Sequence, residues 1–234
     1  MAAPLSWTRL VALLEEHHPE IARPVSSDPF ELVLWEQVAY LASDVVRAAA
    51  FKELRKRTSL DPQRILALPL KELETIARSG GSIAWRERAQ RMRNSSEQAA
   101  TLSELGKLNV AEARRRLKKF AMIGGPGADR ILLHAQLFPV FGLESNGLRV
   151  LMRLGFGTPA KDYAGTYRSV LAALDALLPA DIDRLSRAER TLRAHGLLIC
   201  TRSAPRCGTC SLLPYCRFGK EQKNTKERAR GRPG

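Results

Sequence analysis

Four cysteines near the carboxyl end are the residues of this sequence best suited to metal chemistry. Cys200, Cys207, Cys210 and Cys216 follow the spacing C-x6-C-x2-C-x5-C, and the chain has no other cysteine. A disulfide pair suits small secreted chains. Structural zinc usually takes two short C-x2-C knuckles, and this chain has one. An iron–sulfur cubane needs four thiolates converging from a short irregular loop, so the spacing favours a cluster over zinc.

The same spacing resembles a known cluster loop. Endonuclease III and the adenine DNA glycosylases, in the helix-hairpin-helix DNA glycosylase superfamily, carry C-x6-C-x2-C-x5-C, and the Ala-Pro-Arg-Cys-Gly-Thr-Cys of residues 204–210 is similar to their loop. The resemblance implies a structural [4Fe-4S] cluster held by the four cysteines. It also implies a loop that faces DNA, where Arg202 and Arg206 can contact phosphates.

Glu36 is the first of three carboxylates to which the resemblance gives a catalytic role. It lies in a nearly all-apolar stretch that begins Pro-Phe at residue 29, as the first barrel helix of the glycosylases does. It falls where adenine glycosylases carry the Glu that protonates the leaving base. From the residues alone, a carboxylate inside an apolar helix equally suggests pairing with a nearby arginine. On the next turn, Leu41 replaces the Gln of endonuclease III.

Asp129 and Glu144 are the other two carboxylates. Bifunctional members of the family have a Lys where this sequence has Asp129. The amine of that Lys forms a Schiff base at the sugar C1′. The resemblance therefore implies a monofunctional enzyme, in which Asp129 helps to position water. Glu144 stands where the family has an Asp that supports the oxocarbenium ion. From the residues alone, a helix cap is the preferred role of Glu144, Ser145 or Asn146.

A Gly-rich turn between two helical stretches resembles the L-P-G-V-G hairpin of the family. It reads Ile-Gly-Gly-Pro-Gly over residues 123–127. We expect its glycines to allow positive φ and close backbone approach, so that the next helix points N–H groups at a phosphate. Pro126 departs from the family because it removes a possible amide donor. The expected DNA contacts of this region are Gly125, Gly127, Lys118, Lys119 and Arg130.

An earlier loop, residues 79–84, also matches a DNA-contacting segment of endonuclease III. There the family pushes a side chain into the base stack. Ile83 is the apolar candidate in this sequence, and Trp85 is the second. Such residues more often pack within the protein, so both interpretations stay open.

Composition sets the class of protein and of partner. The chain has 234 residues and 44% hydrophobic content, which predicts a globular protein, while aromatic content of only 6% favours helices over sheet. The formal net charge of +14 indicates an anionic polymer, most simply nucleic acid. A ribosome-like or merely basic protein is the alternative. No apolar run reaches transmembrane length, and the amino end lacks a signal-peptide pattern. We therefore expect no membrane partner and a reducing, cytoplasmic location.

Periodicity and caps predict an all-α chain. Asp28 and Asp61 are placed as helix caps, each followed by a proline at the first helical position. His17 and His18 end the first helix and are expected to be solvated, whereas His195 is expected to pack or cap. The predicted helices cover residues 7–18, 29–45, 45–57, 62–78, 85–93, 109–120, a stretch after the hairpin, a helix ending at 154, 161–178 and 183–198.

The resemblance completes the expected architecture and function. It implies a two-lobed helix-hairpin-helix DNA glycosylase fold: a six-helix lobe over 29–137, a cluster lobe from 1–28 plus 138–217, and a basic disordered tail over 218–234. Double-stranded DNA would lie between the lobes, with a damaged or mismatched base flipped out and hydrolysed from its sugar by a monomeric enzyme. The alternatives are a bifunctional lyase with a relocated amine from Lys118 or Lys119, and an inactive DNA-damage binder.

Overall fold

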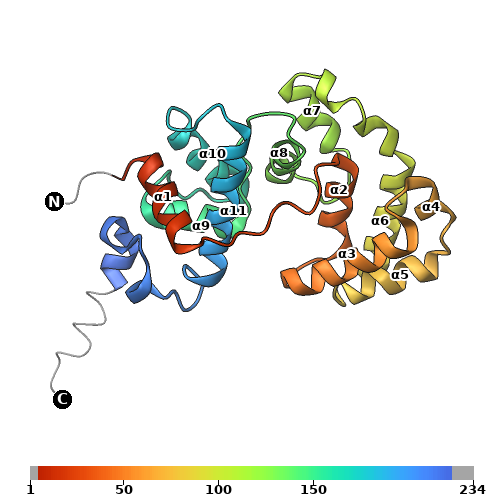
Figure 1. Ribbon diagram of the computed structural model, residues 1–234, viewed down its shortest axis with the longest axis horizontal. Coiled ribbons are helices and arrows are strands. Elements are labelled where there is room, and N and C mark those ends of the chain that lie inside the picture. The colour runs from red at the N-terminus through yellow and green to blue at the C-terminus, as the bar shows by residue number, and fades with distance from the viewer. Residues whose placement is uncertain (1–4, 223–234) are drawn as a thin grey trace, which may run out of the picture. The chain divides into compact units, whose positions relative to one another are not determined.

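The computed structural model describes residues 5–222 (Figure 1). It divides the chain into two compact units, one formed by residues 24–138 and the other by residues up to 23 together with those from 139 onward. All regular structure in the described residues is helical, which confirms the all-α fold class. Among these residues, no helix combines the length and apolar character needed to span a membrane.

The unit formed by residues 24–138 is built around α2 (Pro29–Val38), which packs against α3, α6 and α8 (Figure 1). Its central position follows from composition, because Leu32, Val33 and Leu34 are all buried. Asp28 caps the helix as predicted, accepting a hydrogen bond from the backbone N–H of Glu31 at 3.0 Å. The other elements are α3 (Asp44–Thr58), α4 (Pro62–Ala67), α5 (Leu70–Ser79), α6 (Trp85–Glu97), the short η1 (Ala99–Leu102) and η2 (Leu105–Lys107), α7 (Val110–Leu117) and α8 (Gly125–His134).

Two helix boundaries differ from the sequence prediction. Helix α2 ends at Val38 instead of running to 45, because Ala39 is extended and Leu41 adopts a left-handed φ of 49°. The predicted helix over 62–78 is two helices, α4 and α5. Leu68 between them is extended, as expected for a residue that precedes a proline, here Pro69.

The other unit contains α1 (Trp7–His17), α9 (Ser145–Leu154), α10 (Tyr163–Leu174) and α11 (Ile182–Leu198). Helices α1 and α9 both pack against α11 (Figure 1). The approach of α9 to α11 requires Gly196, since a Cβ there would lie 2.5 Å from the carbonyl oxygen of Asn146. Glycine therefore lets the two helices meet beside the first turn of α9.

The cysteine loop follows α11 and holds two single-turn elements, η3 (Cys207–Thr209) and η4 (Leu213–Tyr215). The chain after it does not begin as the disordered arm that we expected, because residues 217–222 are helical. The rest of that predicted arm, 223–234, lies outside the described residues.

Candidate functional site

The four cysteines converge on one small pocket. None of them forms a disulfide, and Cys200, Cys207, Cys210 and Cys216 all line the pocket. Burial, together with the neighbouring cysteines, raises the pKa of the Cys210 thiol to about 11, and burial likewise raises the pKa of Cys216. Thiols in such a place bind a metal with loss of their protons. The remaining pocket residues are Ile199, Pro205, Leu213, Phe218 and Gly219.

Two hydrogen-bond donors and one histidine ring nitrogen approach three of the four sulfurs. The backbone N–H of Gly219 donates to Cys216 Sγ at 3.3 Å, and Arg153 Nη1 donates to Cys200 Sγ at 3.2 Å. His195 Nε2 lies 3.4 Å from Cys210 Sγ. Donors of this kind stabilise negatively charged sulfur, as in clusters whose potential depends on hydrogen bonds to the thiolates. The residues present therefore fit a cluster held by four thiolates.

Two arginines of α9 hold the beginning of the cysteine loop. Arg149 donates through Nε to the carbonyl oxygen of Cys200 at 2.9 Å. Arg153 donates through Nη1 to the carbonyl oxygen of Thr201 at 2.8 Å, and its guanidinium lies 4.1 Å from the ring centroid of Phe218. Because these arginines are four residues apart, they project from one face of the helix and reach neighbouring carbonyls of the loop.

Glu144 is the N-cap of α9, the same helix that holds the loop. Its Oε1 accepts hydrogen bonds from the backbone N–H of Asn146 at 2.7 Å and of Gly147 at 2.8 Å, and its Oε2 accepts from the Asn146 side chain at 2.7 Å. The cap preferred from the residues alone is therefore observed. The carboxylate is half-buried and is held at the positive end of the dipole of α9.

Glu36 and Asp129 are each paired with an arginine in the unit of residues 24–138. Arg130 forms an ion pair with Glu36, whose side chain is 25% exposed, so the pairing suggested by the apolar helix is also observed. Arg114 forms an ion pair with Asp129, whose side chain is only 5% exposed. A guanidinium favours the ionised form of its carboxylate partner. Glu144 belongs to the other unit, together with the cysteines.

The hairpin between α7 and α8 differs from the prediction in its backbone. Gly125 and Gly127 do not adopt positive φ; in this turn Met122 does, with φ of 71°. Both glycines lie in the first turn of α8, and a Cβ at Gly125 would meet no atom within 4 Å. The advantage of glycine there is thus an open surface over the helix N-terminus, not a special φ. Pro126 occupies the first turn, where helices tolerate a missing N–H. The basic residues of this region divide by exposure, with Lys118 and Lys119 exposed and Arg130 half-buried.

Ile83 lies in an exposed loop that a buried arginine holds in place. Its side chain is 49% exposed, whereas Trp85 is half-buried at the start of α6. The guanidinium of Arg88, which is fully buried, donates to the carbonyl oxygens of Val38, Gly81 and Ile83. A second exposed apolar residue belongs to the α2–α3 connection that this loop contacts: Leu41 is 77% exposed.

Arg202 and Arg206, the predicted phosphate contacts of the cysteine loop, are both exposed. His18 corrects the expectation of solvated histidines, because it is buried and its Nε2 lies 3.1 Å from Nδ1 of His195. Desolvation, then the charges of His18 and His17, lower the pKa of His195 to about 4.

No family model matches the chain. The chain is 27% identical over 203 residues to endonuclease III of Bacillus subtilis (strain 168), covering 85% of each protein, and 24% identical over 210 residues to endonuclease III of Escherichia coli (strain K12), covering 89% of this chain and 93% of the relative.

Three solved structures share the fold. A trapped endonuclease III–DNA covalent intermediate matches with a TM-score of 0.71 and 25% identity over 91% of this chain and 95% of that one. A non-covalent endonuclease III–DNA complex matches with a TM-score of 0.74 and 24% identity, over 96% of this chain and 100% of that one. A thermostable thymine-DNA glycosylase matches with a TM-score of 0.73 and 15% identity, over 92% of this chain and 96% of that one.

These likenesses in sequence and fold support the predicted resemblance to the helix-hairpin-helix DNA glycosylase superfamily. Within that superfamily fold, sequence reasoning missed Arg114, Arg153 and the exposure of Leu41. Of these, only Arg153 had a signal in the sequence. It follows Arg149 by four residues on a helix that precedes the cysteines, and such a pair shares one helix face. The partner of Asp129 had no such signal, since many arginines surround Arg114 in the sequence.

Proposed function

We propose that this protein is a DNA repair glycosylase that flips a damaged or mismatched base out of double-stranded DNA and hydrolyses its N-glycosidic bond with water. Kinship with endonuclease III, the structural likeness to protein–DNA complexes and the net charge of +14 support DNA as the substrate. A base inside a duplex is out of reach of any side chain, so base flipping accompanies the reaction.

The observation that carries the monofunctional assignment is the state of Asp129. This residue stands where bifunctional relatives have the Schiff-base Lys, and it is buried and paired with Arg114. A carboxylate cannot form a Schiff base with the sugar. Its burial also leaves it poorly placed to direct water. We therefore propose that Asp129 fixes α7 to α8 and that Glu144 positions the attacking water.

Glu144 is the carboxylate that we propose supports the oxocarbenium ion. Two backbone N–H groups and the Asn146 amide donate hydrogen bonds to this carboxylate and hold its orientation. Glu36 is the proposed proton donor to the leaving base. Because Arg130 favours the ionised form of Glu36, we propose that contact with DNA draws Arg130 toward a phosphate and so lets Glu36 take up a proton.

We further propose that Cys200, Cys207, Cys210 and Cys216 hold a [4Fe-4S] cluster. A bound cluster would supply structural cohesion to a loop that has no core of its own. Arg149 and Arg153 then attach that loop to the helix that Glu144 caps. We propose that Arg202 and Arg206 contact phosphates, and that Ile83 with Leu41 fills the gap in the base stack. The proposed enzyme is a cytoplasmic monomer, associated with the nucleoid in a bacterium.

The test separates catalysis from capping at Glu144. Serine is a good N-cap residue, so Glu144→Ser should keep α9 while removing the carboxylate. We expect base release from single-lesion duplexes to fall about 100-fold or more, with DNA affinity retained. Asp162→Ser, the same kind of change at the N-cap of α10, is the matched control and should leave base release unchanged. Base release by Glu144→Ser at the rate of the unmodified protein would refute the assignment.

A panel of duplexes, each with one lesion, defines the substrate class. Oxidised pyrimidines, deaminated bases in mismatches and alkylated purines are the classes to compare, scored for base release and for strand breaks with and without hot alkali. Base release with strand breaks that appear only after alkali fits the monofunctional assignment, because alkali cleaves the strand at the abasic site. DNA binding to lesions without any release would instead identify an inactive damage-binding protein.

A further inference from the structure

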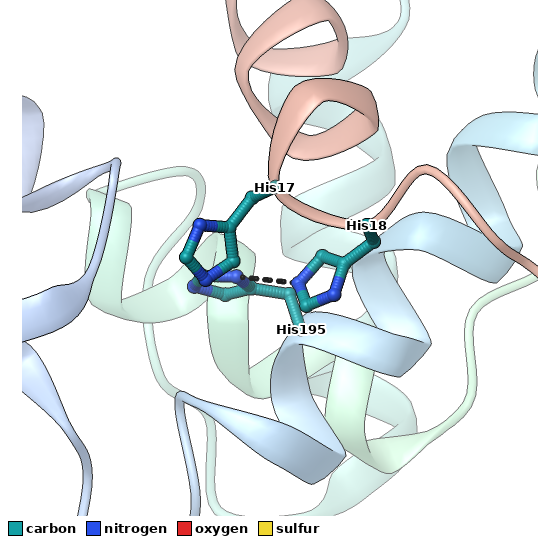
Figure 2. A group of neighbouring side chains, drawn as sticks. All are labelled: His17, His18 and His195. Atoms are coloured by element: carbon teal, nitrogen blue, oxygen red, sulfur yellow. Dashed lines mark hydrogen bonds between the residues drawn. The ribbon is translucent and has the colours of Figure 1, made fainter.

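Three of the four histidines of the chain lie close together, although His195 is 177 residues from His18 in the sequence. His17 and His18 lie at the end of α1, and His195 lies in the last turn of α11. Figure 2 shows the three imidazole rings converging from the two helices. One ring nitrogen of each residue lies within 4.8 Å of the ring nitrogens of the other two.

The spacing of these nitrogens is close to that of a tetrahedral metal site. Zinc binds imidazole at about 2.0–2.1 Å, which places two nitrogen ligands about 3.3 Å apart at the tetrahedral angle. His18 Nε2 and His195 Nδ1 are 3.1 Å apart. The remaining ring belongs to His17, which is half-buried at the helix end and has a ring nitrogen within 4.8 Å of those of the other two histidines.

The second nitrogen of His195 is also placed as in a metal site. A histidine that binds a metal almost always donates its other ring N–H to an acceptor, and this fixes the ring and its tautomer. Here Nδ1 faces His18, and Nε2 lies 3.4 Å from Cys210 Sγ. A proton on Nε2 leaves the lone pair of Nδ1 directed at the point where the other imidazoles converge.

A bound metal ion accounts for this arrangement better than ring packing alone does. His18 is 9% exposed and His195 is 1% exposed, so two polar rings have left water with each other as hydrogen-bond partners. A shared cation would satisfy the lone pairs of all three rings. Three histidines with a fourth position open to water form a recognised zinc ligand set.

We propose that His17, His18 and His195 form a binding site for one divalent transition-metal ion, with Zn²⁺ as its simplest occupant. The site uses nitrogen ligands and is distinct from the cysteine pocket, so it does not depend on the proposed glycosylase activity. Its ion joins α1 to α11, two helices at opposite ends of the chain.

Zinc uptake by the intact protein tests the proposal. Protein prepared without oxygen is dialysed against Zn²⁺ alone, and zinc and iron are measured by atomic emission. The unmodified chain should hold one more equivalent of Zn²⁺ than the double variant His17→Asn/His18→Asn, with equal iron. His134→Asn, which changes the remaining histidine, is the matched control and should bind as the unmodified chain does. Equal zinc in the double variant and the unmodified chain overturns the proposal.

Two further measurements keep the test decisive. If the double variant does not fold, the single variant His17→Asn replaces it, and unchanged Zn²⁺ affinity in that variant overturns the proposal. X-ray absorption at the zinc edge should show nitrogen ligands at about 2.0–2.1 Å. A shell of sulfur at about 2.3 Å would place the ion on the cysteines and exclude the histidine site.

Discussion

Arg88 gives the sharpest test of how this structure positions its exposed apolar side chains. Its guanidinium is fully buried and donates to the carbonyl oxygens of Val38, Gly81 and Ile83, which fastens the loop carrying Ile83 to the end of α2. Burial lowers the pKa of Arg88, which reflects the cost of holding this charge away from water. The perturbation is Arg88→Met, which keeps much of the apolar stem and removes the donors.

The expected magnitude follows from those hydrogen bonds. A hydrogen bond to a charged group contributes about 1.5–3 kcal/mol, and a buried acceptor left without a donor loses a similar amount. The carbonyl of Ile83 is in an exposed loop and can bond water, so only the bonds to Val38 and Gly81 are counted. Two bonds at the lower value give about 3 kcal/mol of lost stability.

Chemical denaturation followed by circular dichroism measures this loss, and limited proteolysis of residues 80–84 measures the release of the loop. Arg86→Met is the matched control, since Arg86 is exposed on the same helix and the substitution makes the same charge change. Surface changes of this kind are usually within about 0.5 kcal/mol. If Arg88→Met and Arg86→Met have the same free energy of unfolding and resist the protease equally, the reasoning is refuted.

Three further predictions follow from the hairpin, the Lys position and the cysteines. Gly125→Ala should keep or slightly raise stability, because its Cβ meets no protein atom within 4 Å, yet it should weaken DNA binding in a salt-titrated affinity assay if a phosphate occupies that surface. Borohydride should trap no covalent adduct with abasic DNA, because Asp129 replaces the Schiff-base Lys; an adduct lost in Lys118→Arg or Lys119→Arg would establish a relocated amine. Protein purified without oxygen should be coloured and contain iron, and Cys210→Ser should lose both; a colourless, zinc-containing protein would contradict the cluster assignment.

Local chemistry made part of the fold predictable. Asp28 and Asp61 were recognisable as caps because a short acidic side chain followed by proline satisfies the first N–H groups of a helix. The early end of α2 was not recognisable, since Ala39 and Leu41 carry no helix-breaking chemistry and adopt their conformations through tertiary contacts. The break before α5 has a visible cause in Pro69, which disfavours helical backbone at Leu68.

Some features of the candidate site were predictable from the sequence, and others appear only in the folded structure. The convergence of the cysteines was predictable because all four lie within 17 residues. The partner of Glu36 is 94 residues away in the sequence, and His195 is 177 residues from His18, so only folding reveals these pairs. The cap role of Glu144 was predictable because its position precedes the first turn of α9, whereas its catalytic role stays a proposal.

The hydrogen bonds of Arg149 also connect the cysteine loop to Glu144. Its Nη2 also donates to the Asn146 side chain at 2.7 Å, and that side chain bonds in turn to Glu144. Arg149 and Asn146 thus connect the backbone of the first cysteine to the acidic group at the helix start. With the role that we propose for Glu144, oxidative damage that unravels the loop would disturb that acidic group without first unfolding the hydrophobic core, so activity would be lost while much of the protein remained folded.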